Sequence, residues 1–358
     1  MKIIVAPDSF KECLGAEEVA RAMAAGLREA VSMAAGLQGA GGGEEPLEVV
    51  EMPLADGGEG TVRVLAAALG ARTVRATVTG PLGEPVEAEY AITRSGSTAI
   101  LEVASACGLP LVPPEKRNPM QTTSRGVGEL ILDALEKGCG RILIGLGGTS
   151  TCDGGAGMLS VSGLREKASG ASFQALYDVD SPFYGPMGAA RIFGPQKGAS
   201  PQEVEILDRK MQAMAEEIRK GTGIDLQTLP GAGAAGGLGG ALAAYLGAEM
   251  RSGVDGILDL VGFDETIQDA DLILTGEGKS DAQTLQGKAP LGVLQRSRGI
   301  PVALVSGAIN DREALRNAGF RYLVPVTPEG MPREKAIDPE TAVENIRKAV
   351  AALIQRYA

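Results

Sequence analysis

The sequence predicts a two-lobed α/β protein, in which one lobe is built on a doubly wound parallel sheet and the other is a discontinuous, mixed α/β domain. Three observations predict this class. Short aliphatic or β-branched runs alternate with helical patterns over much of the chain. Residues 72–105 break this rhythm with consecutive strand patterns. The 358 residues, 44% of them hydrophobic, suffice for two hydrophobic cores rather than one.

The first lobe is predicted from strands that alternate with helices. The strand KIIVA precedes a helical pattern over residues 16–34, and LEVVEM precedes another over residues 60–69. A last helix is expected over residues 339–357. Four later runs have the length and aliphatic content of buried strands: RILIGL, LILTG, PVALVSG and YLVPV. This alternation predicts a parallel sheet of Rossmann or flavodoxin type with helices on both faces.

The second lobe is predicted from two regions that interrupt the alternation. Over residues 72–105, the patterns RTVRATVTG, PVEAEYAIT and STAILEVA are separated by the turn sequences GPLGEP and RSGS, which predicts a meander. Residues 154–250 are rich in Gly and Ala and hold few strand patterns. By composition, residues 34–46 form a surface loop or linker. We therefore expect a first domain of residues 1–71, 120–150 and 255–358, and a second domain of residues 72–119 and 151–254.

The charge and hydropathy of the chain exclude several classes of partner. The formal net charge is −11 and no basic run is present, which argues against nucleic acid as the main ligand. Any anion site must then be built locally from Lys, Arg and backbone N–H groups. The N-terminus reads as a strand rather than a signal peptide, and the longest uncharged run, GAGAAGGLGGALAAYLG, is too weakly hydrophobic for a bilayer. We expect a cytoplasmic enzyme, monomeric or homodimeric.

The cysteine and histidine content limits the chemistry. The spacing of Cys13, Cys107, Cys139 and Cys152 indicates neither a zinc site nor a disulfide framework. The chain contains no histidine, which excludes Ser-His-Asp and Cys-His catalysis and any His-ligated metal. A general base must therefore be Asp, Glu, Lys, Tyr or Cys. A bound metal would have oxygen ligands, which favours Mg²⁺.

The stretch DLILTGEGKSD, residues 271–281, resembles a P-loop but does not have its spacing. The motif G-x-x-x-x-G-K-[ST] ending at Ser280 requires glycine at position 273, and the residue there is Ile273. The first glycine allows such a loop to turn its N–H groups towards phosphate. The stretch is therefore not a Walker A loop, although Glu277, Lys279 and Asp281 could still hold an anion or a metal.

Several clusters of glycine with acidic or basic residues occur, most of them after predicted strands. In open α/β sheets, ligands bind beyond the carboxyl ends of strands, and glycine allows close approach to phosphate. Together the clusters favour phosphoryl transfer over hydride transfer. They are APDSFK, LADGGEG, GLGGTSTCDGGAG, YDVDSP, FGPQKGA, PGAGAAGGLGG and TGEGKSDAQTLQGKAP.

Each motif also has a structural interpretation. GAGAAG matches G-x-G-x-x-G, but it lacks a convincing preceding strand and a following acid, so a tight packing loop is about equally plausible. Asp56 could simply cap a helix. In an extended segment, Asp178 and Asp180 would lie on the same side. Their carboxylates could form a metal site, or the pair could have no function, and the sequence favours neither interpretation. The four glycines and three hydroxyls around Asp153 exceed what capping requires. The cysteines Cys107 and Cys152 are expected to pack in the core.

These motifs, and their order along the chain, resemble those of the type-I glycerate kinases of bacteria. The similarity extends over nearly the whole chain, including VPPEKRNPMQTTSRGVGELI, and long motifs such as PPEKRNP and FGPQKGA are specific to that family. The sequence departs from the family at three points. The segment LSVSGLREKASGASFQALY, between GGAGM and DVD, is shorter than in relatives, and TSTCDGG stands where many relatives have SATNDGG, a polar change that keeps the aspartate. Gln286 stands where relatives often carry His. The resemblance implies a two-domain α/β fold and ATP-dependent phosphorylation of D-glycerate with Mg²⁺, giving 2-phosphoglycerate.

Alternatives to this activity are a glycerate 3-kinase that gives 3-phosphoglycerate, a nicotinamide-dependent oxidoreductase of hydroxy acids, and a sugar-acid-binding regulator without turnover. With the resemblance in view, we predict that the clusters meet in one cleft between the lobes. Phosphoryl transfer depends mainly on positioning and on neutralising charge.

Individual roles are hypotheses from residue type and position. Asp180 is predicted to be the base, with Asp178 as the alternate, and Asp153 and Glu277 are predicted to hold Mg²⁺. Arg125 would bind the substrate carboxylate through a bidentate fork. The positive charges that balance the phosphates or the carboxylate are those of Lys11, Lys197 and Lys279, with Lys197 in the catalytic group. The remaining predicted binding residues are Asp8, Asp56, Asp281, Gly147, Gly148, Gly154, Gly155, Gly233 and Gly236.

Overall fold

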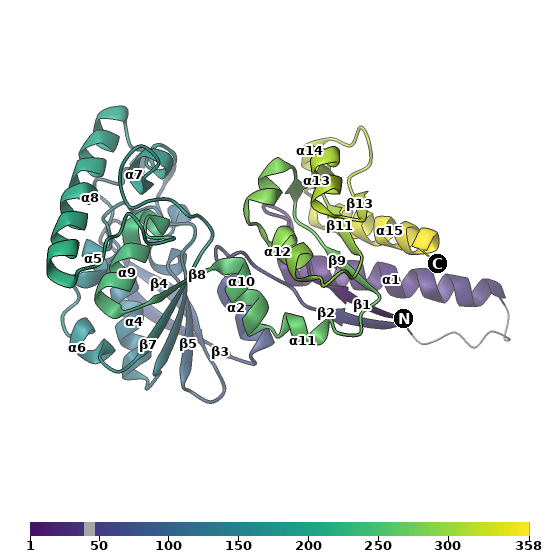
Figure 1. Cartoon of the computed structure of the whole chain (residues 1–358), viewed down its shortest axis with the longest axis horizontal. Coiled ribbons are helices and arrows are strands. Elements are labelled where there is room, and N and C mark those ends of the chain that lie inside the picture. Colours follow the sequence, from purple (N-terminus) through teal and green to yellow (C-terminus); the bar gives the residue numbers. More distant parts are fainter. Residues whose placement is uncertain (39–46, 358) are drawn as a thin grey trace. The chain divides into compact units, whose positions relative to one another are not determined.

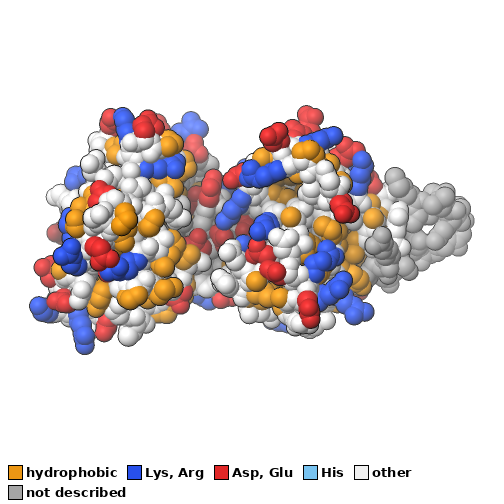
Figure 2. All heavy atoms as spheres, turned by 90° about the horizontal axis from the view of Figure 1, so that it is seen from above, with side chains coloured by type: hydrophobic (Ala, Val, Ile, Leu, Met, Phe, Trp, Pro, Cys, Tyr) orange, Lys and Arg blue, Asp and Glu red, His pale blue; other side chains and the backbone are white. Residues whose placement is uncertain are grey.

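The computed structural model describes residues 1–38 and 47–357 (Figure 1). The chain forms two compact units. Unit 1 contains Met1–Asp56 and Ile257–Ala358, and unit 2 contains Gly57–Gly256. The predicted α/β class is confirmed in both. Figure 2 shows acidic, basic and apolar side chains interspersed over the visible face of each unit. None of the helices in the described ranges has the length and hydropathy needed to span a bilayer.

Unit 1 contains a five-stranded sheet in which every neighbouring pair is parallel. Numbered along the chain, the strands have the order 2-1-3-4-5, which is the flavodoxin-like form of the doubly wound sheet. β9 and β11 are buried throughout, as a parallel sheet covered on both faces requires. The strands, from one edge of the sheet to the other, are β13 (Tyr322–Pro325), β11 (Val302–Ser306), β9 (Leu272–Thr275), β1 (Lys2–Val5) and β2 (Glu48–Glu51).

One face of this sheet is covered by the first and last helices, α1 (Ala16–Gln38) and α15 (Pro339–Tyr357). Met23 and Ile346 pack with Ile3 of β1 in one hydrophobic core. The other elements of unit 1 are α11 (Phe263–Thr266), α12 (Ala289–Arg296), α13 (Arg312–Ala318), α14 (Arg333–Ala336), the 3-10 helix η5 (Ala282–Gln286) and the two-stranded sheet of β10 (Lys279–Ser280) and β12 (Ala308–Ile309). Helix α10 (Gly253–Leu260) crosses the boundary between the units.

The predicted linker over residues 34–46 differs from the structure in its first part. Helix α1 continues to Gln38, because Ala and Leu in this stretch are good helix formers. Residues 39–46 lie outside the described residues. The predicted last helix over residues 339–357 is confirmed.

Unit 2 contains a six-stranded mixed sheet whose strands follow one another in chain order. The first three are antiparallel, which confirms the predicted meander, and the last four are parallel. The strands are β3 (Arg72–Thr79), β4 (Pro85–Ile92), β5 (Thr98–Glu102), β6 (Arg141–Gly145), β7 (Ser172–Tyr177) and β8 (Glu249–Ser252).

Two hydrophobic cores stabilise unit 2. The larger contains Tyr90, Ile131 and Phe173, and the smaller forms around Phe183 and Met211. The longest helix of unit 2 begins with a capping box between Ser200 and Glu203. The helices are α2 (Thr61–Ala68), α3 (Ala104–Cys107), α4 (Arg125–Glu136), α5 (Ala156–Leu159), α6 (Leu164–Ala168), α7 (Ala189–Phe193), α8 (Pro201–Thr222) and α9 (Leu238–Leu246), with 3-10 turns η1 (Leu109–Leu111), η2 (Pro114–Lys116), η3 (Pro195–Lys197) and η4 (Ala234–Gly237).

The compact units differ from the predicted domain ranges. Residues 57–71, 120–150 and 255–256 are predicted to belong to the first domain, and they lie in unit 2. β6 forms hydrogen-bonded ladders with β5 and β7, so it is an interior strand of the second sheet. Its aliphatic sequence matches the buried strands of either sheet equally well, because pairing is decided by tertiary contacts rather than by composition.

Candidate functional site

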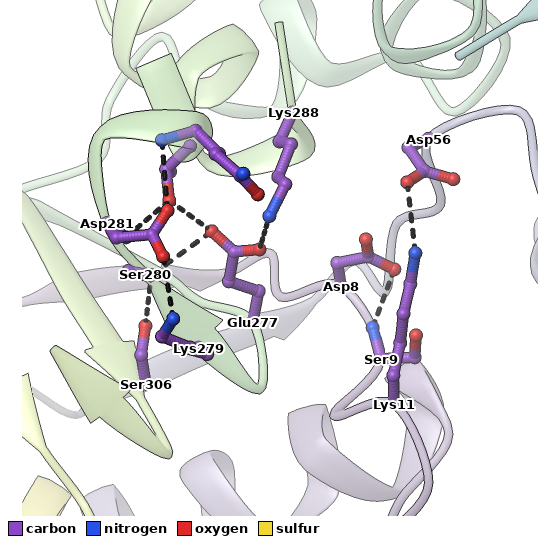
Figure 3. Close-up of polar contacts among 12 residues, drawn as sticks. Asp8, Ser9, Lys11, Asp56, Glu277, Lys279, Ser280, Asp281, Lys288 and Ser306 are labelled. Atoms are coloured by element: carbon purple, nitrogen blue, oxygen red, sulfur yellow. Dashed lines mark hydrogen bonds and ion pairs between the residues drawn. The ribbon is translucent and has the colours of Figure 1, made fainter. Parts of the chain in front are cut away.

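In unit 1, three acidic residues follow three neighbouring strands. Asp8 follows β1, Asp56 follows β2 and Glu277 follows β9. The carboxyl ends of parallel strands meet at one edge of a sheet, so these residues lie close together (Figure 3). The Asp8 N–H donates to the Gly276 carbonyl at 2.9 Å, which joins the loops after β1 and β9. This position is the switch point at which flavodoxin-like sheets bind ligands.

Asp8 is the most strongly perturbed of these acids. Its side chain is buried, and Oδ1 accepts a hydrogen bond from the Ser9 N–H at 2.6 Å. Burial, together with the negative charge of Asp56, raises the pKa of Asp8 to about 7. Lys11 partly opposes this effect, with Nζ 3.8 Å from Asp56 Oδ2. The group can therefore change its charge near neutral pH.

Glu277 is held by a buried network. Its Oε1 accepts from Thr284 Oγ1 at 2.6 Å and from Ser280 Oγ at 3.2 Å, and its Oε2 accepts from Lys288 Nζ at 3.0 Å. Ser280 Oγ lies 2.7 Å from Ser306 Oγ, which joins the network to β11. Three donors thus hold the Glu277 carboxylate in one orientation.

Lys279 and Asp281 form an ion pair beside this network, with Nζ 3.0 Å from Oδ2. The hydrogen bond from Lys279 lowers the pKa of Asp281. Asp281 also accepts from the Gln283 N–H at 2.9 Å and begins η5, so it caps that turn. Ile273 lies inside β9, which confirms that the stretch is not a Walker A loop. Gly276 serves packing, because a Cβ there would lie 1.7 Å from the Val305 carbonyl oxygen.

These residues surround a cavity of about 570 Å³ in unit 1. The structure brings together the predicted residues Asp8, Lys11, Asp56, Glu277 and Lys279 around it, and Asp281 joins through Lys279. Sequence reasoning missed Lys288, although its place in QGKAP, directly before a helix, was a usable signal. Phe10 was missed although it lies within APDSFK, and Met331, Arg333, Ala336 and Ile337 were missed because they belong to none of the motifs.

In unit 2, the predicted lysine lies against the predicted glycine loop. Lys197 is buried, and its Nζ donates to Thr149 Oγ1 at 3.0 Å and to the Thr151 carbonyl at 2.7 Å. An ammonium group has three donor hydrogens, and these bonds use two of them. Gly147 and Gly148 precede Thr149 directly, so the structure brings these predicted residues together.

Asp153 organises the same loop. Its Oδ2 accepts from the Ser124 N–H at 2.9 Å, from Ser124 Oγ at 2.8 Å and from the Gly157 N–H at 3.1 Å. Its Oδ1 accepts from the Gly155 N–H at 3.0 Å. Four donors therefore occupy the carboxylate, which fits an anchor of the loop better than a metal ligand.

The glycines of unit 2 mainly permit close packing. A Cβ at Gly147 would lie 2.4 Å from Gly58 Cα, and one at Gly236 would lie 2.0 Å from the Thr151 carbonyl oxygen. A Cβ at Gly233 would lie 2.3 Å from the Pro182 carbonyl oxygen. Similar crowding surrounds Gly154 and Gly155. Residues 231–240 are all buried, so the structure favours the packing interpretation of GAGAAG over a phosphate or dinucleotide loop.

The remaining predicted residues lie on exposed segments of unit 2. Asp180 Oδ1 accepts from the Gly231 N–H at 2.9 Å, and Asp178 follows β7 directly. Arg125 pairs with Glu129 at 2.9 Å and donates to Ser160 Oγ at 3.2 Å. Arg125 also follows Ser124, the partner of Asp153, so it adjoins the same network.

The predicted magnesium ligands do not fit a metal ion in this structure. The carboxylates of Asp153 and Glu277 are occupied by protein donors. Within residues 1–38 and 47–357, no group of three or more His, Cys, Asp or Glu side chains is arranged to hold a metal. Mg²⁺ can still accompany a nucleotide, because it keeps waters and binds mainly through phosphate oxygens.

Known proteins similar to this chain agree on its family. The sequence model described as the glycerate kinase family matches residues 3–165 and 159–358. A glycerate kinase of Bacillus subtilis (strain 168) is 40% identical, over 99% of this chain and 98% of that protein, and a glycerate 2-kinase of Escherichia coli (strain K12) is 43% identical, over 87% and 86%. The alignment with the Bacillus protein spans 387 residues, more than the 358 of this chain. The two family matches overlap at residues 159–165, inside the segment expected to be short.

The three-dimensional comparison agrees. A crystal structure presented as a candidate glycerate kinase 2 from Salmonella typhimurium LT2 has a TM-score of 0.83 and 37% sequence identity, and covers 100% of this chain and 99% of that one. With 40% identity over nearly the full length, the resemblance seen in the motifs is confirmed. The chain belongs to the glycerate kinase family.

Proposed function

We propose that the protein phosphorylates D-glycerate with ATP and yields 2-phosphoglycerate. The observation that carries the proposal is family membership, which includes 43% identity to a protein named glycerate 2-kinase. The chemistry of the two sites supports it. Unit 1 offers Lys11, Lys279 and Lys288 around one cavity, and phosphoryl transfer requires positive charge near the transferred group.

The residues of unit 2 supply the other roles in the proposal. Asp180 orients or deprotonates the attacking hydroxyl, with Asp178 as the alternate. The Gly231 N–H fixes the Asp180 carboxylate through Oδ1, which would hold it in one orientation. Arg125 pairs with the glycerate carboxylate, and the third donor hydrogen of Lys197 contacts an anionic oxygen.

In this proposal, Mg²⁺ accompanies ATP. Bound to the phosphates, it would neutralise charge on the transferred group. It would be held by phosphate oxygens and water, and Asp153 and Glu277 are not assigned to it because their oxygens accept protein hydrogen bonds.

The test is to mix the protein with ATP, Mg²⁺ and D-glycerate and to follow ADP release. Phosphorus NMR of the product shows which of the two hydroxyls of glycerate is phosphorylated. We expect ADP and 2-phosphoglycerate, with L-glycerate as the control substrate. A 3-phosphoglycerate product would overturn the regiochemistry, and the absence of ADP would overturn the activity.

A further inference from the structure

The cavity of unit 1 has two kinds of lining. The loops after β1, β2 and β9 provide charged side chains, among them Asp8, Asp56, Lys279 and Lys288. The segment after β13, at the edge of the sheet, provides the apolar side chains Met331, Ala336 and Ile337. Phe10 and Cys13 add apolar surface from the loop after β1.

The order of the strands separates these two linings. β1 and β2 lie at one edge of the sheet and β13 at the other, with β9 and β11 between them. Arg333, at the start of α14, forms an exposed ion pair with Glu12 at 2.5 Å, so the segment after β13 also contacts the loop after β1. The lining of the cavity therefore has a charged part and an apolar part, and the three apolar residues Met331, Ala336 and Ile337 come from the single segment after β13.

The lysines on the charged side can each reach an anion. Lys279 is 60% exposed and Lys288 36% exposed, and each is oriented by one carboxylate, Asp281 and Glu277. An ammonium group that donates once to a carboxylate has donor hydrogens left for phosphate oxygens. Figure 3 shows Lys288 and Glu277 on one side of Asp8, with Lys11 and Asp56 on the other.

Of the two substrates of the proposed reaction, only one has both an apolar face and an anionic tail. Glycerate is a small acid without an apolar part, whereas a nucleotide has a flat base and a chain of phosphates. A volume of about 570 Å³ lies within the usual range of sites for molecules of nucleotide size.

We propose that this cavity binds the nucleotide, with the purine against Met331, Ala336 and Ile337 and the phosphates against Lys279 and Lys288. The assignment rests on the proposed function, because it takes ATP as one of the two substrates. Unit 1 then binds ATP, the phosphoryl donor of the reaction.

The first experiment titrates the full chain by calorimetry with ADP, adenosine and inorganic tripolyphosphate. Ala336→Phe fills the apolar part of the cavity. We expect it to weaken the binding of ADP and of adenosine at least about tenfold, while the affinity for tripolyphosphate changes less than about twofold. Lys279→Met should weaken the binding of ADP and of tripolyphosphate but not that of adenosine. Ala318→Phe, at the exposed C-terminus of α13, is the matched control and should change none of them.

The second experiment uses the unaltered protein, so it does not depend on how a variant folds. Of the four cysteines, all of which are in described segments, Cys107, Cys139 and Cys152 are buried, whereas Cys13 is partly exposed and lines the cavity. Burial raises the pKa of the Cys13 thiol, so labelling with iodoacetamide requires mildly alkaline buffer. We expect ADP to slow alkylation of Cys13 at least about fivefold, and D-glycerate alone to leave the rate unchanged.

The outcomes separate the two proposals. If ADP does not bind, or binds equally well to folded Ala336→Phe and does not protect Cys13, the assignment of the cavity is wrong. If ADP binds and protects as expected but D-glycerate is not phosphorylated, the nucleotide site stands and the proposed activity fails. Protection of Cys13 by D-glycerate instead of ADP would reassign the cavity to the acid.

Discussion

Asp180 combines a structural bond with the proposed catalytic role. Its Oδ1 accepts from the Gly231 N–H at 2.9 Å, and an asparagine would keep that acceptor while losing the charge. We therefore expect Asp180→Asn to fold normally and to reduce kcat by about 10²–10⁴-fold, the usual range for loss of a general base. Steady-state kinetics with thermal denaturation as the folding check measures this. A rate within a few-fold of the unaltered protein would remove Asp180 as the base, and Asp178→Asn would then be measured.

Asp153 tests whether a carboxylate in a glycine-rich loop binds a metal or organises the loop. Asn at this position would retain one acceptor but replace Oδ2, which receives three hydrogen bonds from Ser124 and Gly157. Because hydrogen bonds to charged groups are strong, we expect Asp153→Asn to lower the free energy of unfolding by about 2–4 kcal/mol. Urea denaturation without Mg²⁺ measures it.

The control for this prediction is Glu216→Gln, an exposed position on α8, which should change stability by less than about 0.5 kcal/mol. If Asp153→Asn were equally neutral and instead raised the Mg²⁺ concentration needed for activity, the original assignment of Asp153 as a metal ligand would be restored.

At the scale of elements, β6 is flanked by two glycines with opposite surroundings. A Cβ on Gly147, after the strand, would lie 2.4 Å from the backbone of Gly58, whereas a Cβ on Gly140, before it, would meet nothing within 4 Å. We expect Gly147→Ala to destabilise unit 2 by about 1–3 kcal/mol, because backbone must move. Gly140→Ala should be neutral or stabilising by up to about 1 kcal/mol. Equal effects of the two changes in urea denaturation would contradict this account.

The loops after strands show why motifs alone overstate the number of binding glycines. GAGAAG has the spacing of a dinucleotide loop, yet it lies between α8 and α9, and its glycines are packed closely against Thr151, Tyr177 and Pro182. The spacing of glycines along the chain indicates where a side chain would not fit. It does not indicate whether the close neighbour is a phosphate or another part of the backbone, because either neighbour excludes a Cβ.

At the scale of the whole molecule, Asp8 makes stability depend on pH. Its folded pKa of about 7 exceeds the ordinary value of 3.8, so between these values the folded state holds a proton that the unfolded state has lost. The contribution of this group is therefore present at low pH and is lost as pH rises through about 7. The largest contribution of Asp8 to the free energy of unfolding is about 4 kcal/mol.

The change Asp8→Asn removes this titration. We expect the variant to be more stable than the unaltered protein at pH 8 and to show a smaller gain or none at pH 4.5, measured by urea denaturation in EDTA without nucleotide. Asp281→Asn is the control of opposite sign, because the pKa of Asp281 is lowered by Lys279 and its contribution is lost as pH falls. A pH-independent effect of Asp8→Asn would show that burial does not hold the Asp8 proton.

The sequence by itself determined the α/β class, the meander, the end of the last helix and the family. These follow from local periodicity and from long motifs, which are properties of neighbouring residues. It also pointed to most of the acids and lysines around the unit 1 cavity, because strand ends of a parallel sheet converge at one edge.

Only the tertiary structure decided that β6 belongs to the second sheet, that Asp153 is occupied by four donors, and that Met331, Ala336 and Ile337 line a cavity with Lys288. Each of these facts depends on which distant segments meet. An aliphatic strand pairs equally well in either sheet, a carboxylate has the same sequence signature whether it binds a metal or backbone N–H groups, and isolated apolar residues carry no pattern. Contacts between residues far apart in the chain make that choice, and local sequence does not encode them.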